Sequence, residues 1–308
     1  MRRGWASTVA LAVISTAIAT ASNGAREVAV DFQNVRFHLG QGVVLEVRRL
    51  QGAMMATRDA PPSFDDLDSY ALRIDAGEVA MTPASLTAVL QHAFNYKGSP
   101  ITDVEVSIEE GKLKQKGTLH KGVAVPFTIV ADLAVTPDGR IRLRPSSVKA
   151  AGLPAGGLMK LFHLELENLI ASNRARGFEI VQNDFLLVAD RLIPEPRISG
   201  RLTSIRIEGD RIVEVFGTRP AHGADKIARN YMYYRGGVLK FGKLTMTDTD
   251  LRLIDADPRD PFEFSPAHYS AQLVAGYSKS MPNGGLRTYM PDLDQAVKAD
   301  SRPVAVLH

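Results

Sequence analysis

The feature that most constrains this chain is a run of alternating apolar and polar residues between Val104 and Pro145. At both ends of the run, single apolar residues alternate with charged or hydroxyl residues. In its middle lies an apolar row with a period of two: Val123, Val125, Phe127, Ile129, Ala131, Leu133 and Val135. Successive side chains of a strand point to opposite faces, so this pattern predicts a sheet with one apolar face. Such a face needs a cover, which could be protein or lipid.

The strands of this run are separated by short turn sequences. Glu110-Gly111, Lys121-Gly122 and Asp138-Gly139 are two-residue loops of the kind that favours hairpins. The run therefore predicts a four-stranded antiparallel meander. Further strands are expected within residues 28–57, 178–216 and 238–254, with a turn at Gly40-Gln41-Gly42.

Two helices with an apolar face are also predicted. In the first, over residues 82–97, Thr82 fits the N-cap, Pro83 the first helical position and Gly98 the stop. The second is expected over residues 154–173. A sheet with one apolar face can pack on such helices and leave an apolar slot between sheet and helix.

The N-terminus is typical of a secretory signal. Arg2 and Arg3 precede an apolar run from Trp5 to Ala19, and Ala19-Thr20-Ala21 fits a small-x-small cleavage pattern. We therefore expect residues 1–21 to be a cleaved signal peptide and the protein to be periplasmic or secreted. A retained membrane anchor is disfavoured because the run is short for a full span.

Composition excludes several classes of function. The formal net charge is +3, and two of these charges are Arg2 and Arg3, so a processed chain is nearly neutral and does not favour nucleic-acid binding. The chain has no cysteine, which excludes disulfide scaffolds, thiolate catalysis, thiolate metal sites and a lipid-modified N-terminal cysteine.

No catalytic or metal-binding motif is found. The seven histidines lack metal-ligand spacing, and no nucleophile elbow is present. The strongest enzyme-like or metal-like signal is the acidic series Asp248, Asp250, Asp255, Asp257 and Asp260, which a solvated strand face followed by a turn explains better than a calcium loop. Tyr231, Tyr233 and Tyr234 could stack on a sugar or meet a lipid interface, but half-buried strand residues are favoured. We expect no catalytic residue, metal or cofactor.

Lipid binding would need no catalytic residue. Each buried CH2 group contributes about 0.8 kcal/mol, so a long acyl chain offers on the order of 10 kcal/mol before ordering costs. The expected lining of the groove is apolar: Leu86, Leu90, Phe94, Val125, Phe127, Ile129, Leu158, Leu161 and Phe162. Arg142 and Arg144 are candidates to meet a phosphate headgroup, although a solvated charged face is favoured for them.

The order of these features resembles the tubular lipid-binding superfamily, in particular LmeA-type bacterial periplasmic phospholipid-binding proteins. The resemblance covers under half of the chain and rests on a pattern. It is carried by the helix begun by Pro83, the strand and turn run Val104–Leu119, the hairpin Asp138–Leu143, the segment Gly152-Leu153-Pro154 and the strand segment Gly200–Glu208. It implies an α+β fold in which a long curved antiparallel meander wraps around one or two long amphipathic helices and holds a lipid in an apolar groove.

The leading interpretation is an exported, non-enzymatic protein that binds an envelope phospholipid or similar acyl-chain ligand and contacts membranes transiently. Residues 26–216 would form the lipid-binding domain, and residues 217–308 a strand extension and irregular tail packed on it. Two other classes stay open: a structural envelope protein with a closed core, and a secreted hydrolase or carbohydrate-binding protein that uses the Asp248–Asp260 region.

Overall fold

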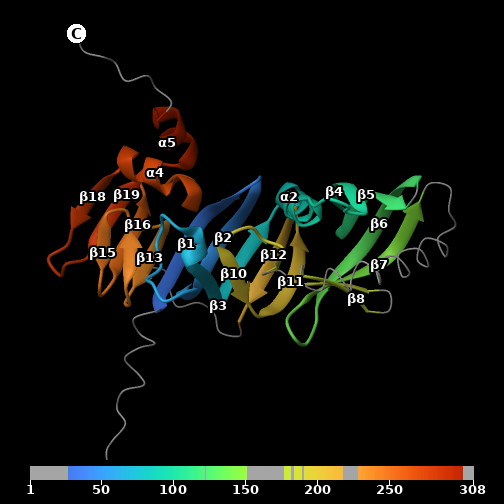
Figure 1. Cartoon of the computed structure of the whole chain (residues 1–308), viewed down its shortest axis with the longest axis horizontal. Coiled ribbons are helices and arrows are strands. Elements are labelled where there is room, and N and C mark those ends of the chain that lie inside the picture. Colours follow the sequence, from blue (N-terminus) through green and yellow to red (C-terminus); the bar gives the residue numbers. More distant parts are fainter. Residues whose placement is uncertain are drawn as a thin grey trace, which may run out of the picture.

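The computed structural model describes residues 27–121, 123–150, 177–181, 184–188, 191–217 and 228–300. Within these residues, 59% lie in strands and 14% in helices. The strands form an 11-stranded sheet, a six-stranded sheet and a two-stranded hairpin. The two larger sheets lie side by side along the long axis of the molecule (Figure 1).

Three long strands form the centre of the 11-stranded sheet. β1 (Glu27–Gly40), β2 (Val43–Ala56) and β3 (Tyr70–Met81) pair antiparallel in sequence order. Alternate residues of β1 and β2 are buried, as expected for strands with one covered face. The predicted turn joins β1 to β2, and positive φ angles at Gly40, Gln41 and Gly42 match its glycine-rich sequence.

Each long outer strand is paired along its free edge by two shorter strands. Beside β3 lie β10 (Arg197–Gly200), which is parallel to it, and β12 (Arg211–Phe216), which is antiparallel. Beside β1 lie β13 (Tyr231–Arg235), antiparallel, and β17 (Phe262–Phe264), parallel.

Six further strands complete the described sheet edges and the hairpin. β11 (Leu202–Glu208) pairs with β12, while β16 (Asp250–Asp255), β19 (Leu286–Met290) and β18 (Tyr277–Ser280) continue outward from β13. β14 (Leu239–Phe241) and β15 (Leu244–Met246) form the separate hairpin. Residues after 217 thus extend a sheet whose centre is built from residues 27–81.

The predicted meander forms the six-stranded sheet. β4 (Ile101–Glu109), β5 (Lys112–Lys121), β6 (Val123–Val135) and β7 (Ile141–Ala150) pair antiparallel in sequence order. β9 (Asp184–Leu187) and β8 (Phe178–Val181) extend it beyond β7. The Glu110-Gly111 turn has positive φ at both residues, the conformation expected of a two-residue hairpin turn.

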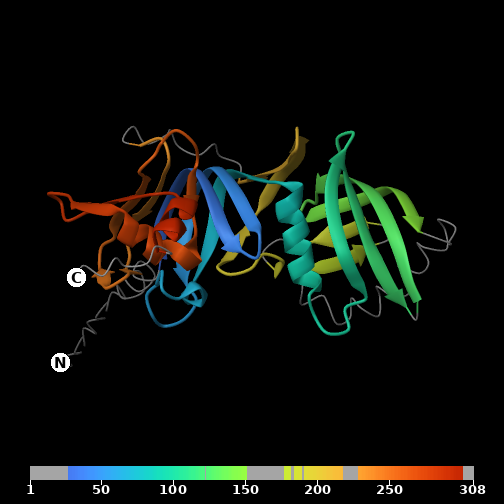
Figure 2. The same ribbon diagram turned by 90° about the horizontal axis from the view of Figure 1, so that it is seen from above.

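The helix α2 (Pro83–Phe94) connects the two sheets and lies between them (Figure 2). Its predicted N-cap is confirmed, because the Thr82 side chain accepts a hydrogen bond from the backbone N–H of Ser85. The Ser85 hydroxyl accepts from the N–H of Val44 on β2, and the Gln91 side chain donates to the carbonyl of Val104 on β4. Through these hydrogen bonds, α2 contacts β2 of the 11-stranded sheet and β4 of the six-stranded sheet.

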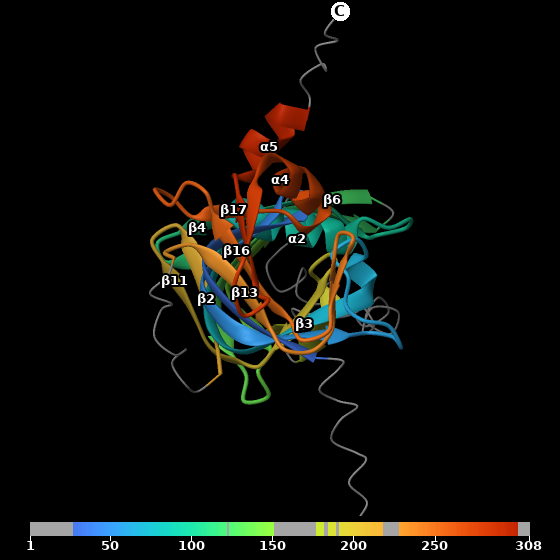
Figure 3. The same ribbon diagram turned by 90° about the vertical axis from the view of Figure 1, so that its left-hand side faces the viewer.

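At the other end of the molecule, loops and short helices cover the 11-stranded sheet. They include η1 (Leu67–Ser69), η4 (Pro266–His268), α4 (Tyr269–Ala275) and α5 (Leu293–Asp300), and Figure 3 shows α4 and α5 above the strands. Phe64, from the loop between β2 and β3, packs its ring against Tyr234, Phe241 and Tyr269 with centroids 5.1 to 5.3 Å apart. An aromatic cluster centred on Phe64 thus fills this part of the core.

The expected α+β fold, with a long meander wrapped around one or two long amphipathic helices, is wrong for the described residues. These are mostly β, in open sheets, and their three α-helices are short. The longest, α2, has 12 residues and is about 18 Å long, too short to fill a sheet of this size. The aromatic cluster centred on Phe64 lies at the 11-stranded sheet and not on the meander. The second predicted helix, residues 154–173, lies outside the described residues.

Replacing Phe64 by alanine should lower the free energy of unfolding by about 3–5 kcal/mol, because a buried ring is lost from the centre of the aromatic cluster. Urea denaturation of the full chain measures this change. Leu244→Ala is the matched control, since Leu244 is 51% exposed and its loss should change stability by less than about 0.5 kcal/mol. Equal effects of the two substitutions would contradict a core centred on Phe64.

Candidate functional site

The main candidate site is a cavity of about 570 Å³ between the 11-stranded and the six-stranded sheet, named here the intersheet cavity. The large sheet contributes side chains from β2, β3, β10, β11 and β12, and the small sheet contributes the turn between β6 and β7. Most of the lining is apolar: Leu45, Ile74, Val79, Val188, Ile193, Ile198, Leu202 and Phe216. Its volume falls within the range of about 300–1,000 Å³ that is usual for small-molecule sites.

The intersheet cavity lies where β10 and β12 share the edge of β3. Along β3, β10 pairs with the residues up to Ile74, and β12 pairs with the residues from Gly77 onward. At the end of β10, a Cβ atom on Gly200 would lie 2.7 Å from the ring of Phe216 and 3.0 Å from Cβ of Ile74. Only glycine lets the two short strands approach β3 this closely, so the shape of the cavity wall depends on Gly200.

The turn between β6 and β7 forms the opposite wall. Its Gly139 has a positive φ of 87°, and a side chain there would meet Cγ of Arg201 at 3.0 Å. The Arg201 guanidinium donates a hydrogen bond of 2.9 Å to the carbonyl of Pro137. Arg140 forms ion pairs with Asp138, at 2.8 Å, and with Glu179. The charged groups of this wall are therefore paired with other parts of the protein.

Glu214 on β12 is the exception among the charged groups of the intersheet cavity. It lines the cavity, is only 8% exposed, and lies opposite Val79 of β3 and Ile205 of β11 in the sheet. No described residue forms a hydrogen bond or ion pair with its carboxyl group. Burial alone raises the pKa of Glu214 from its ordinary value of 4.5 to about 7.

The sequence analysis did not single out Glu214, although a signal was present. Glu214 stands within Ile212-Val213-Glu214-Val215-Phe216, where both neighbours on each side are apolar. A strand that is apolar on both faces is buried on both faces, so a single acidic residue within it is a buried charge. Such a residue is a candidate for a site, because strongly shifted titrating groups cluster at functional positions.

The predicted groove residues lie elsewhere. Leu90, Val125, Phe127 and Ile129 are buried in the protein core. Leu86 is partly buried, and Phe94 lines a separate hollow of about 400 Å³ beside α2. None of these six lines the intersheet cavity. The other predicted groove residues, Leu158, Leu161 and Phe162, fall outside the described residues. A contact of these nine residues with lipid stays a prediction.

The predicted headgroup residues share one carboxylate. Arg142 and Arg144 both pair with Asp184 of β9, at 3.8 and 3.3 Å. The hydrogen bonds that Arg144 donates to the Asp184 carboxylate raise the pKa of Arg144, so its charge persists across the physiological range. Neither side chain lines the intersheet cavity.

The Asp248–Asp260 region serves structural contacts. Buried Asp255 accepts hydrogen bonds from the Asn230 side chain and the N–H of Asp257, and Asp257 pairs with Arg259. Asp250 accepts from Asn283. Among the described residues, no three acidic or histidine side chains are grouped so that they could hold a metal ion.

The three tyrosines of β13 are engaged in the same part of the sheet. Tyr231 and Tyr234 are buried, and Tyr233 lies under the guanidinium of Arg252, which is 4.2 Å from its ring centroid. Buried rings cannot serve as an exposed stacking surface for a sugar. The structural role favoured by the sequence agrees with this placement.

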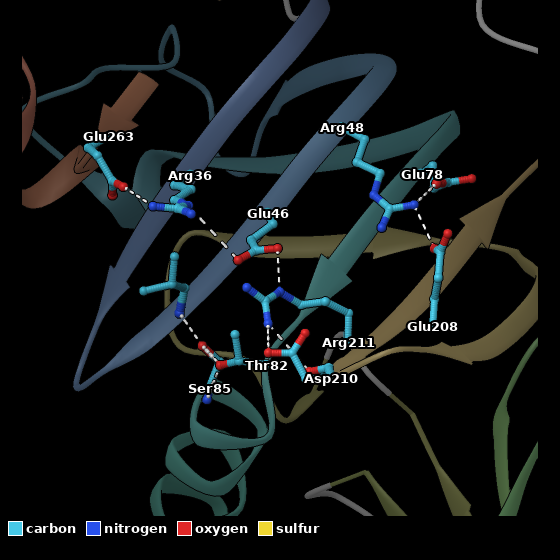
Figure 4. A network of polar contacts seen from close by, with 11 residues as sticks. Arg36, Glu46, Arg48, Glu78, Thr82, Ser85, Glu208, Asp210, Arg211 and Glu263 are labelled. Carbon is cyan, nitrogen blue, oxygen red and sulfur yellow. Dashed lines mark hydrogen bonds and ion pairs between the residues drawn. The ribbon is translucent and has the colours of Figure 1, made fainter. Parts of the chain in front are cut away.

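A second charged feature crosses the opposite face of the large sheet (Figure 4). A row of ion pairs runs from Glu263 of β17 through Arg36 of β1, Glu46 of β2 and Arg211 of β12 to Asp210. Arg48 of β2 pairs with both Glu78 and Glu208. Leu45 and Val79 line the cavity, and Glu46 and Glu78 are their neighbours along the strands. Neighbouring residues of a strand point to opposite faces, so these ion pairs, named here the ladder, lie on the face away from the cavity.

The ladder compensates its own charges. Partial burial raises the pKa of Glu78, but hydrogen bonds from Arg48 and Arg206 outweigh it, so the net shift of its pKa is downward. Exposed ion pairs of this kind contribute about 0–1 kcal/mol each. We therefore assign the ladder a role in sheet register rather than in ligand binding.

Comparison with family models, with curated proteins and with solved structures finds no match to this chain. Among the residues that the structure describes, no helix combines the length and the apolar character needed to cross a membrane. The candidate site is thus assigned from its own geometry.

Glu214 should make the stability of the protein depend on pH. Its folded-state pKa lies above the unfolded value, so the favourable protonated form is held at low pH and its contribution is lost as pH rises through about 7. Glu214→Gln removes this titration. Urea denaturation measures the free energy of unfolding of both proteins. The difference between them should change by about 3 kcal/mol in favour of the variant as the pH is raised from about 5 to about 8.

The control for this experiment is Glu208→Gln, a surface carboxylate of the ladder on β11. Its stability difference from the wild type should stay constant over the same pH interval. A Glu214→Gln curve parallel to that of the wild type would show that Glu214 is not the buried, unpaired carboxyl described above.

Proposed function

We propose that this chain is an exported lipid-binding protein whose intersheet cavity takes up the apolar chain of its ligand. The observation that carries the proposal is the cavity of about 570 Å³, which has a largely apolar wall and lies between the two larger sheets. Sites at such junctions, with few polar groups, are the usual form of small-molecule pockets.

The energetics are adequate for binding. An acyl chain that buries ten methylene groups in such a cavity gains roughly 8 kcal/mol before the costs of ordering. Binding requires no catalytic residue and no metal. A closed core, which is the structural alternative, does not account for a cavity of this size or for an unpaired carboxyl within it.

The site differs from the groove expected from the sequence. The groove was placed between a meander and a long helix, and the intersheet cavity lies between two sheets. Export, transient contact with a membrane and the resemblance to phospholipid-binding proteins remain parts of the proposal that the N-terminal sequence and the strand pattern support.

Filling the cavity should abolish binding. The full chain is purified without detergent, its bound lipid is identified by solvent extraction and mass spectrometry, and palmitoyl lysophosphatidylcholine serves as the reloading probe. Val79→Phe places a ring in the cavity and should weaken probe binding at least about tenfold, while its stability changes by less than about 1.5 kcal/mol because the added volume enters free space.

Val47→Phe is the matched control for the same experiment. Val47 pairs directly with Val79, is equally buried and does not line the cavity. The larger side chain should therefore destabilise the protein by about 1–3 kcal/mol and leave probe binding intact. A wild-type protein that neither carries lipid nor binds the probe, or a Val79→Phe variant that binds normally, would overturn the proposal.

A further inference from the structure

Glu214 differs from the other buried carboxyl groups of the described residues, which have hydrogen-bond donors. Asp255 accepts from Asn230 at 2.7 Å and from the N–H of Asp257 at 2.8 Å. Asp292 accepts from the N–H of Glu263 at 2.8 Å. Glu214 is buried to a similar degree and has no donor from any described residue. Burying such a group without a partner is costly, and most buried polar groups in folded proteins are paired.

No described donor on the cavity walls, which include the Ser199 hydroxyl, forms a hydrogen bond with Glu214. Its neighbours across the strands are Val79 and Ile205, and the nearest cavity residues of its own strand are apolar. The charged groups on the other walls are Asp138, Arg140 and Arg201. Arg140 is held by Glu179 and Asp138, and Arg201 donates to the Pro137 carbonyl. The carboxyl group is thus left available to a molecule inside the cavity.

We infer that the ligand of the intersheet cavity carries a hydrogen-bond donor at the end of an apolar chain, and that Glu214 is the anchor for this donor. The inference rests on the proposed function and specifies its ligand class. In its ionised form the Glu214 carboxylate only accepts hydrogen bonds, so it pairs best with a cationic amine, less strongly with a hydroxyl group, and repels another carboxylate. The ligand class is therefore a long-chain amine or amino alcohol rather than a fatty acid.

The test compares three ligands that share one chain length: decylamine, 1-decanol and decanoic acid. Their affinities for the full chain are measured by titration calorimetry at about pH 8, where the Glu214 carboxyl is ionised and the amine is protonated. The wild type should bind decylamine about tenfold more tightly than 1-decanol, because the contact with the ionised carboxyl is charge-assisted. Decanoic acid should bind most weakly.

Two variants separate a specific contact from general attraction to an amine. Glu214→Gln keeps the size of the side chain and removes its charge, so it should bind decylamine and 1-decanol within about twofold of each other while binding of 1-decanol persists. Glu208→Gln removes a carboxylate from the outer face and should keep the preference of the wild type.

The outcomes distinguish this inference from the proposed function. If none of the three ligands binds to the wild type, the proposed function itself fails. If all three bind equally well, or if Glu214→Gln retains the preference for decylamine, the cavity binds apolar chains and Glu214 is not their anchor. Loss of the preference in Glu208→Gln would assign it to surface charge, which also overturns the inference.

Discussion

The structure depends on a mismatch in length between strands that pair with one another. β1 and β2 have 14 residues and β3 has 12, whereas the strands on their outer edges have three to six. A long edge must be paired along its whole length, because unpaired N–H and C=O groups are costly when they are buried. Two short strands therefore share each long edge, one parallel and one antiparallel.

The shared edge of β3 creates the site. At this point the sheet leaves a cavity, which the turn between β6 and β7 faces from the second sheet. α2 holds the second sheet in place through hydrogen bonds to β2 and β4. The cavity is thus a product of strand pairing and of one short helix.

Local chemistry explains what the sequence predicted correctly. The meander from β4 to β7 is encoded by alternation and by turn residues such as Gly111, and α2 is encoded by Thr82 and Pro83, all within a few residues of the elements they define. The pairing of β1 with β13, or of β3 with β10, joins segments far apart in sequence and has no local signal. The resemblance to a lipid-binding family rests on an order of strands and turns that many antiparallel sheets share, and the long helices that it implied are absent from the described residues.

The pairing of β1 also has a consequence for the timing of folding. β1 can pair with β2 as soon as residues 27–56 are made, and the meander can complete itself before the chain ends. The other edge of β1 waits for β13 and β17, and the Tyr231 side chain that bonds to Asp31 comes 200 residues later. During synthesis, this edge, with Val30 and Phe32 beside it, is an open strand on a partly formed sheet. The growing chain therefore carries an unpaired strand edge that can mispair with other chains until residues near 264 arrive.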